Sequence, residues 1–440
     1  MRTSAARIHG RGDVRIDDVE LPPITPDEVL LKVVSSSMCL STYKAVTLGP
    51  EHKRVPDDVA DNPVMTGHEF AGILEEVGAN LTDRYAVGQH VAIQPAMGLP
   101  GGESPGYSYP FYGGDATYTI VPKVAIDLGC VLPYDGDYFA NASLAEPMMC
   151  VIGAFHANFH TREFVYEHQM GLKPGGRLAL LGAAGPMGLG AIQYALERPY
   201  RPRLVVVTDV DAARLERARA LVPPERASEA GVRLVYLNTA DAPGQDAAAA
   251  LRAVAEEPGA ASEGAASEGS ASEGYDDVFV FAPIRELVET ADAVLARDGC
   301  LNLFAGPTDR DFTAGLNFYR VHYESTHVVG TSGGSASDMQ ESLDLSAAGR
   351  INPSMLVTHI GGLDAVPETV VHLPQIPGGK KLIYPHIALP LTAIDDFAAL
   401  GADDPLFARL AEICAGHQGL WNADAEAVLL DALDPAASGR

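Results

Sequence analysis

The chain has 440 residues, of which 47% are hydrophobic and 20% are charged. A chain of this length can bury a large core and is expected to form two domains, and its composition is ordinary for a soluble globular protein. Its 58 acidic residues outnumber 31 basic ones and give a formal net charge of −27, which disfavours nucleic acid and anionic membranes as partners.

The sequence gives no sign of a membrane or secreted protein. No apolar run reaches the roughly 18 residues that a membrane-spanning helix needs. Residues 1–7 lack the apolar core of a signal peptide, so we expect a cytoplasmic protein. The cysteines are odd in number, which favours reduced thiols, and they lack CxxC spacing, so the sequence indicates no cysteine-cluster zinc site. They are Cys39, Cys130, Cys150, Cys300 and Cys414.

The first part of the chain is predicted to be rich in β-strands. The first ~35 residues alternate in the manner of short strands and turns, and residues 29–34 are a good strand that follows a group of prolines. Further strands are expected over residues 68–77, 87–93 and 116–121, which glycines separate. These segments indicate a β-rich module.

From about residue 176 the pattern changes to apolar strands that alternate with helices rich in alanine, leucine and arginine. This alternation is typical of a parallel α/β sheet. Strands are expected over residues 177–181, 204–208, 232–237, 277–281, 300–304 and 328–331, and helices over residues 188–197, 211–221, 285–296 and 339–348.

A low-complexity segment interrupts this alternation. Residues 260–274 consist of Ala-Ala-Ser-Glu-Gly repeats with one substitution, and none of their apolar side chains is larger than alanine. Such a segment cannot bury a core. We therefore expect an insertion near residues 258–274 that forms a mobile surface loop.

A candidate metal site lies in the β-rich module. His68 and Glu69 stand side by side between Gly67 and Gly72, and Cys39 precedes them. A His-Glu dipeptide alone is common, but a thiolate, an imidazole and a carboxylate are all ligand types that zinc takes. The combination predicts a zinc site.

A glycine-rich segment lies between the strand at 177–181 and the helix that follows. Its glycines have the spacing GxxGxxG rather than strict GxGxxG. At such a position, backbone N–H groups and the positive end of a helix dipole can bind a dinucleotide pyrophosphate. The predicted cofactor residues are Gly182, Gly185, Pro186, Met187 and Gly188.

The next strand ends in Asp209, which suggests the choice of cofactor. A carboxylate at this position accepts hydrogen bonds from ribose hydroxyls and repels a 2′-phosphate, so NAD(H) is favoured over NADP(H). Arg214 follows closely and could contact the cofactor, although an arginine on the helix surface is the plainer interpretation.

Together these residues resemble the zinc-dependent medium-chain dehydrogenase/reductase family over nearly the whole chain. The stretch from Gly67 to Gly78 is similar to the family's zinc signature, residues 37–41 to its first-ligand segment, and residues 182–188 to its cofactor loop. The polyol dehydrogenase branch is the most similar, because the four-cysteine lobe of alcohol dehydrogenases is absent from residues 97–114. Residues 39–44 and 52–56 further resemble L-sorbose 1-phosphate reductases.

The resemblance implies an α/β protein with a GroES-like catalytic domain split around a Rossmann domain. The first part of the catalytic domain is expected over residues 1–150, the NAD-binding Rossmann domain over 151–335, and the second part over 336–440. It further implies a homo-oligomer, by analogy with dimers and tetramers in the family.

The resemblance also implies one catalytic zinc and no structural zinc. Cys39, His68 and Glu69 are the expected ligands. Glu146, direct or through water, is a fourth candidate, and Cys150 is the alternative. Zinc would polarise the carbonyl of a polyol or sugar phosphate while hydride passes to or from the nicotinamide.

Other residues have expected roles in substrate and proton handling. Ser41 occupies the family's proton-relay position, although a turn or capping role is the alternative. Lys44 falls where relatives place a relay histidine, and could assist or bind substrate. Lys53 and Arg54 form a basic island that could bind a substrate phosphate, with surface ion pairs as the competing interpretation.

The leading hypothesis is a zinc-dependent, NAD(H)-dependent oxidoreductase of a secondary alcohol or ketone, for example one that interconverts L-sorbose 1-phosphate and D-glucitol 6-phosphate. A zinc-free quinone or enoyl reductase of the same superfamily is one alternative, which the Cys39, His68 and Glu69 set disfavours. A dinucleotide-binding protein without turnover is the other.

Overall fold

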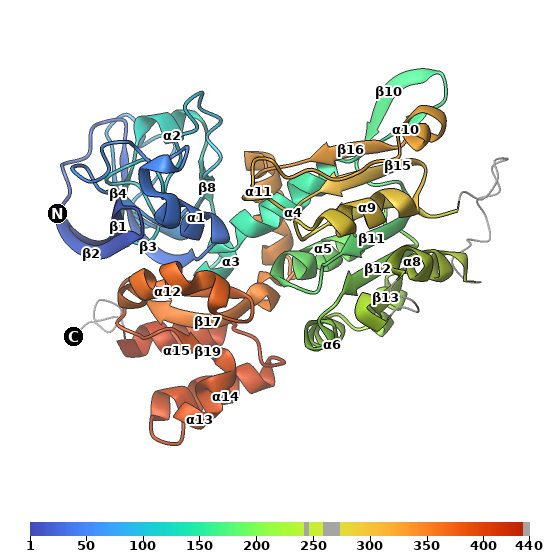
Figure 1. Ribbon diagram of the computed structural model, residues 1–440. Coiled ribbons are helices and arrows are strands. Elements are labelled where there is room, and N and C mark those ends of the chain that lie inside the picture. The colour runs from blue at the N-terminus through green and yellow to red at the C-terminus, as the bar shows by residue number, and fades with distance from the viewer. Residues whose placement is uncertain (242–245, 258–272, 434–440) are drawn as a thin grey trace. The chain divides into compact units, whose positions relative to one another are not determined.

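The computed structural model describes residues 1–241, 246–257 and 273–433. It divides into two compact units, one formed by Met1–Met148 with Ser335–Arg440 and the other by Met149–Gly334 (Figure 1). Most of the repeat segment expected near 258–274 lies outside the described residues.

The first unit is built on a mixed sheet in the order β19-β17-β18-β3-β5-β6-β8, with β7 also paired to β3. The segments at 68–77, 87–93 and 116–121 form the strands β5, β6 and β7. The bounds are β3 Val29–Ser37, β5 Glu69–Val77, β6 His90–Ile93, β7 Tyr118–Val121, β8 Val131–Pro133, β17 Val357–Gly362, β18 Lys380–Tyr384 and β19 Thr392–Ala393.

A second, three-stranded sheet and a set of short helices complete this unit. The strands run in the order β2-β1-β4, with bounds β1 Arg2–Gly10, β2 Asp13–Glu20 and β4 Val64–Met65. The helices are α1 Leu40–Leu48, α2 Lys123–Asp127, α3 Phe139–Ser143, α11 Ala336–Ala347, α12 Val366–His372, α13 Phe397–Leu400, α14 Pro405–Gly416 and α15 Ala423–Leu433.

The C-terminal helices pack on the sheet through a large apolar cluster. Trp421, Phe397 and Tyr384 are fully buried in it. No element after the helix at 339–348 was predicted for this part of the chain. The structure shows that α14 and α15 instead cover one part of the sheet with apolar side chains.

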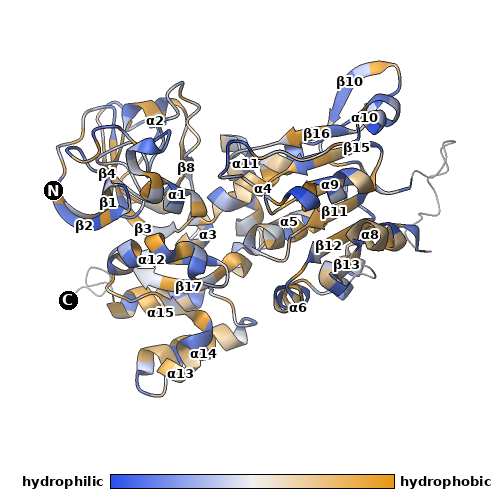
Figure 2. Ribbon diagram, viewed as in Figure 1, coloured by the Kyte–Doolittle hydropathy of each residue, from blue (hydrophilic) through white to orange (hydrophobic). Residues whose placement is uncertain are grey.

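The second unit contains a parallel six-stranded sheet in the order β13-β12-β11-β14-β15-β16. The α/β fold expected from the sequence is confirmed. The strands are runs of valine and leucine because helices cover both faces of a parallel sheet, and they carry orange in Figure 2. Their bounds are β11 Arg177–Leu181, β12 Leu204–Asp209, β13 Arg233–Asn238, β14 Tyr275–Val280, β15 Leu295–Leu303 and β16 His327–Gly330.

The helices of this unit are α5 Pro186–Glu197, α6 Ala212–Leu221, α7 Pro224–Glu229, α8 Ala247–Glu256, α9 Arg285–Val294 and α10 Phe318–Glu324. Three of them, α5, α6 and α9, lie close to those expected, and α7, α8 and α10 were not predicted. The longer α4 (Ala145–Ala157) begins in the first unit and continues into the second.

A β-hairpin of the second unit was not predicted. It consists of β9 (Phe159–Arg162) and β10 (Val165–Met170), paired antiparallel. Most of β10 is exposed, so its side chains lack the apolar alternation of a half-buried strand. Phe164 adopts a left-handed φ of 65° in its turn, where glycine would have been the recognisable signal.

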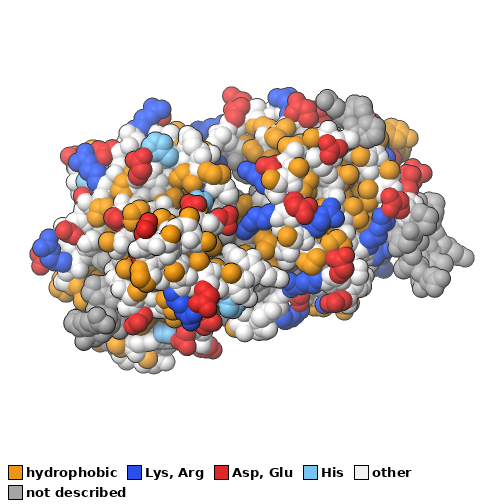
Figure 3. Space-filling model, turned by 90° about the horizontal axis from the view of Figure 1, so that it is seen from below, with side chains coloured by type: hydrophobic (Ala, Val, Ile, Leu, Met, Phe, Trp, Pro, Cys, Tyr) orange, Lys and Arg blue, Asp and Glu red, His pale blue; other side chains and the backbone are white. Residues whose placement is uncertain are grey.

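Charged side chains of both signs lie on the face drawn in Figure 3, interspersed with apolar and neutral surface. Within the described part of the chain, no helix is long and apolar enough to cross a membrane.

Candidate active site

Cys39, His68 and Glu69 come together in the first unit. Cys39 follows β3 and is the N-cap residue of α1, while Glu69 is the first residue of β5. The antiparallel pairing of β3 with β5 sets Ser37 opposite Glu69, and this register brings the two strand ends together. One ligand atom from each of Cys39, His68 and Glu69 lies within 4.8 Å of the other two.

Gly67 allows the chain to turn directly before His68. Its φ is +85°, a conformation that L-residues rarely adopt, and a Cβ there would lie 2.4 Å from the Asp115 backbone nitrogen. The glycine next to the His-Glu pair is therefore required by both conformation and space.

Glu69 is held by a lysine that the sequence analysis missed. Lys380 Nζ, from β18, lies 2.5 Å from Glu69 Oε1 and 2.6 Å from Oε2, and Ser37 Oγ also donates to Oε2. Glu69 is 0% and Lys380 is 8% exposed. The only sequence signal was a pair of lysines, Lys380 and Lys381, at the start of a short strand more than three hundred residues away.

The cluster shifts the acidity of its members. Although burial raises the pKa of Glu69, Lys380 and His68 together lower it below the usual value, so Glu69 is a carboxylate. Burial lowers the pKa of Lys380, but Glu69, Cys39 and Glu146 together raise it more, so this lysine stays protonated. Burial and the Glu69 charge raise the pKa of Glu146 to about 8. Glu146 is buried near the beginning of α4.

His68 is surrounded by hydroxyl groups. Tyr107 OH lies 3.1 Å from Nδ1, Thr42 Oγ1 lies 3.3 Å from Nδ1, and Ser41 Oγ lies 3.3 Å from Nε2. Ser41 Oγ also donates to Cys39 Sγ at 3.0 Å. Because hydroxyls can donate or accept, they can adapt to the loss of a proton from either imidazole nitrogen.

This donor set fits zinc. A cysteine sulfur, an imidazole and a carboxylate lie within reach of one ion, and Ser41 contacts two of the three groups. Among described residues, Cys39 clusters in this way with His68 and Glu69 only. Cys150 belongs to the second unit and is not in the cluster.

The predicted basic residues lie beside this cluster. The Arg54 guanidinium carbon lies 5.2 Å from the centre of the Tyr107 ring, and Tyr107 OH contacts His68. Arg54 Nε is buried and finds no hydrogen-bond acceptor among the described residues. Burial, Arg54, Lys53 and Lys44 lower the pKa of His52 to about 4, which shows that positive charge is concentrated here.

The glycine loop of the second unit has the shape that a dinucleotide needs. Gly185 is the N-cap of α5, and no atom would lie within 4 Å of a Cβ there. At Gly188 a Cβ would lie 1.8 Å from the Ala183 carbonyl oxygen, so only glycine lets α5 pack against the loop. Gly182 has a φ of +66°, while Pro186 and Met187 open the helix. The residues therefore leave space for a pyrophosphate at the end of α5.

Asp209 ends β12 and faces this loop. Its Oδ2 accepts a hydrogen bond from the Ala184 backbone nitrogen at 3.1 Å, and Oδ1 accepts from Val210 and Asp211. Arg214 lies on the exposed side of α6 with its Nε 3.5 Å from Asp211 Oδ2. The surface interpretation of Arg214 agrees with this placement.

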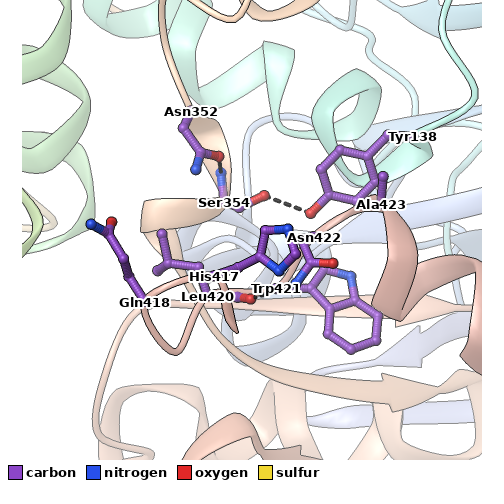
Figure 4. Close-up of a pocket in the computed structure, with 9 residues that line it drawn as sticks. All are labelled: Tyr138, Asn352, Ser354, His417, Gln418, Leu420, Trp421, Asn422 and Ala423. Carbon is purple, nitrogen blue, oxygen red and sulfur yellow. Dashed lines mark hydrogen bonds between the residues drawn. The ribbon is translucent and has the colours of Figure 1, made fainter. Parts of the chain in front are cut away.

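A pocket of about 280 Å³ lies elsewhere in the first unit. Figure 4 shows Ser354 and Tyr138 facing each other across a 2.5 Å hydrogen bond, with Trp421 and His417 beside them. None of the site residues predicted from the sequence lines it. The pocket shares no lining residue with the Cys39–His68–Glu69 cluster.

Comparison with known proteins places these features in context. Residues 25–128 match the family model of the alcohol dehydrogenase GroES-like domain. The chain is 55% identical to mannitol-1-phosphate 5-dehydrogenase of Aliivibrio fischeri, over 98% of each chain. It is 43% identical to L-sorbose 1-phosphate reductase of Klebsiella pneumoniae, over 97% of each.

A solved structure shares the fold. Galactitol-1-phosphate dehydrogenase from Escherichia coli is similar with a TM-score of 0.62 and 20% identity, over 87% of this chain and 100% of that one. At that identity the likeness concerns the fold alone.

Proposed function

The chain belongs to the zinc-dependent medium-chain dehydrogenase/reductase family, in its polyol dehydrogenase-like branch, and we propose that it transfers hydride between NAD(H) and a phosphorylated polyol or ketose. Two relatives that span almost the whole chain are named for sugar phosphates, a mannitol 1-phosphate and an L-sorbose 1-phosphate. The observation that carries the proposal is the Cys39–His68–Glu69 cluster, in which His68 and Glu69 are buried, together with the Arg54 guanidinium on the Tyr107 ring that contacts His68.

Cys39 and His68 would hold the zinc, and Glu69 would contribute its charge as ligand or close neighbour. When bound, zinc supplies a Lewis acid that polarises the substrate carbonyl or acidifies the alcohol. Lys380 and Ser37 fix Glu69 so that its carboxylate cannot rotate freely. Glu146 is the further candidate ligand.

Ser41 is positioned to move the proton of the reaction. Its Oγ lies within hydrogen-bonding distance of both Cys39 Sγ and His68 Nε2, so it stands at the edge of the cluster. A hydroxyl can accept a proton from the substrate oxygen while it donates its own to a neighbour. Lys44, on the same helix, is a candidate for the next group in the proton relay or for substrate binding.

Arg54 is the proposed phosphate ligand, with Lys53 beside it. The guanidinium is fixed over Tyr107, which positions a planar fork of donors close to His68. Its buried Nε without an acceptor is a donor that a phosphate oxygen could satisfy. The alternative of surface ion pairs has no support at Arg54, because its buried Nε finds no acceptor within the described residues.

NAD(H) is the proposed cofactor, since Asp209 supplies a carboxylate where the ribose of a bound dinucleotide would lie. Replacing Asp209 by serine should raise the kcat/KM with NADPH relative to that with NADH by about tenfold or more. An unchanged ratio would contradict this assignment.

The first test measures bound metal and turnover together. Elemental analysis of untagged protein should show that Cys39→Ser loses one zinc per chain relative to wild type. The same variant should lose roughly a thousand-fold or more in kcat/KM with mannitol 1-phosphate and L-sorbose 1-phosphate, because a metal contributes several kcal/mol to the transition state. Full activity without the metal would instead favour the zinc-free reductases.

The second test separates phosphate binding from chemistry. Arg54→Ala should raise KM for the sugar phosphate by about 10- to 100-fold, since a charge-assisted hydrogen bond contributes roughly 1.5–3 kcal/mol. KM for the unphosphorylated polyol should barely change. Arg15→Ala, which removes an exposed arginine paired with Asp13, is the matched control. Equal effects of Arg54→Ala on both substrates would exclude a phosphate site.

A further inference from the structure

A second cluster of metal-binding side chains lies in the other unit. His160 comes from β9, Asp298 from β15 and His327 from β16. One ligand atom of each residue lies within 4.8 Å of those of the other two. The three residues join the unpredicted hairpin to two strands at the edge of the parallel sheet.

Oxygen acceptors surround the His160 ring on both sides. Nε2 lies 3.2 Å from Asp277 Oδ1, while Nδ1 lies 3.0 Å from the Asp298 carbonyl oxygen and 3.5 Å from its Oδ2. A neutral imidazole has one N–H donor and one lone pair. Its lone pair would therefore face an oxygen, which is unfavourable unless a cation lies between them. In a metal-free protein a proton serves as that cation, because a protonated imidazole donates from both nitrogens.

Asp277 determines which nitrogen of His160 is available. The carboxylate is 2% exposed, and it also accepts hydrogen bonds from Asn158 Nδ2 at 2.7 Å and from the Lys173 backbone nitrogen. It is thus fixed as the acceptor for Nε2–H. A carboxylate that orients a histidine in this way is the usual second partner of a metal-bound imidazole, and it directs Nδ1 toward Asp298.

His327 places a buried ring nitrogen at ion-pair distance from Asp298. Its ring stacks on Phe159 with centroids 4.5 Å apart, which fixes its plane. Nε2 is buried and lies 3.2 Å from Asp298 Oδ1, yet no described atom meets hydrogen-bond geometry with it. Two ligands of one metal ion have this arrangement: the nitrogen lies close to the carboxylate but is not aligned for a hydrogen bond with it.

The spacing also fits an ion. Zinc binds imidazole nitrogen and carboxylate oxygen at about 2.0–2.2 Å, so two ligands of a tetrahedral site lie roughly 3.4 Å apart. The observed separations between Asp298 oxygens and the two histidine nitrogens are 3.2 and 3.5 Å. Asp298 is itself rigid, because Thr161 donates to it from both its backbone nitrogen and its hydroxyl.

We propose that His160 Nδ1, Asp298 and His327 Nε2 bind a structural divalent zinc ion that ties the β9–β10 hairpin to the sheet edge. The ion replaces the proton between His160 and Asp298, and it accepts the lone pair of His327 Nε2. It differs from the catalytic candidate in having no cysteine and in lying wholly within Met149–Gly334. This proposal departs from the single zinc expected from the sequence.

Metal content tests the proposal directly and does not depend on activity. Untagged full-length protein should contain two zinc ions per chain, His327→Gln one, and Cys39→Ser one. His168→Gln is the matched control. Like His327, His168 stacks on Phe159, but it lies outside the cluster. It should retain both ions.

A titration isolates the new site from the catalytic candidate. Metal-depleted Cys39→Ser should bind one equivalent of added Zn²⁺, and its melting temperature should rise on binding. The double variant Cys39→Ser/His327→Gln should bind at least a hundred-fold more weakly, and its melting temperature should not respond. If both proteins bind zinc equally, or neither binds it, the cluster is a proton-bridged network and the proposal is wrong.

Discussion

The two ends of β18 stabilise buried carboxylates in opposite ways. At its beginning, Lys380 supplies a full positive charge to Glu69, and the pKa of Glu69 lies below its usual value despite burial. At its end, Tyr384 OH donates to Glu426 at 2.7 Å, and the Phe139 and Ala140 backbone nitrogens also donate to it. All three of these donors are uncharged, and burial raises the pKa of Glu426 to about 7.

The difference shows what a buried carboxylate requires to remain ionised. Both glutamates are almost fully buried, and both accept hydrogen bonds. Hydrogen bonds from dipoles alone do not offset the loss of hydration, whereas a lysine at ion-pair distance does. Glu69 therefore keeps a permanent charge beside the candidate zinc ligands, while Glu426 exchanges a proton near neutrality and ties α15 to the beginning of α3.

Removal of the cation should have the largest effect. Lys380→Met leaves the Glu69 charge buried without a partner, and we expect the metal-free protein to lose about 3–5 kcal/mol in free energy of unfolding. Denaturant unfolding measures this loss. Lys123→Met is the control, because Lys123 forms an exposed pair with Asp127, and its free energy should hardly change. Similar losses in the two variants would show that Glu69 does not depend on Lys380 to compensate its buried charge.

The pH dependence of Glu426 should be the next largest effect. Because its folded pKa is raised above the unfolded value of 4.5, the folded state binds more protons between pH 4.5 and about 7, and stability falls as pH rises through this range. Between pH 5 and 7.5, wild type should lose about 2–3 kcal/mol relative to Glu426→Gln, which cannot ionise. A pH-independent difference between the two proteins would mean that Glu426 is ionised throughout, as Glu69 is.

Loss of the tyrosine hydroxyl should be smaller and should change the pH dependence. Tyr384→Phe removes a donor to Glu426 and the acceptor of Trp421 Nε1, which lies 2.6 Å from the hydroxyl. We expect a cost of about 1–3 kcal/mol. The midpoint of the Glu426 transition should move to higher pH, because the ionised form loses a hydrogen bond. A lower midpoint would contradict the role of Tyr384 as donor.

The smallest effect is expected at Ser37. Ser37→Ala removes one hydrogen bond to Glu69 but leaves the Lys380 ion pair, so the cost should be about 1 kcal/mol. Zinc content should not change. A loss as large as that of Lys380→Met would show that Ser37 stabilises the Glu69 carboxylate as much as Lys380 does.

The sequence alone determined the fold class and the local motifs. Alternation of valine-rich and leucine-rich strands with helices reports burial on both faces of a sheet, and the structure has that sheet. Gly67 and Gly188 were identifiable because each meets a local requirement, a positive φ at Gly67 and a close backbone approach at Gly188. Cys39, His68 and Glu69 were identifiable because their side-chain chemistry suits one kind of ion.

Only the tertiary structure decided which charges meet. Lys380 lies on a strand far along the chain from Glu69, and His160, Asp298 and His327 come from three separate strands. A single sequence records local periodicity and residue type, whereas ion pairs and metal clusters depend on strand pairing between distant segments. The hairpin that carries His160 was missed for the same reason: its strands are stabilised by contacts with Asp277 and Asp298, and not by an apolar pattern of their own.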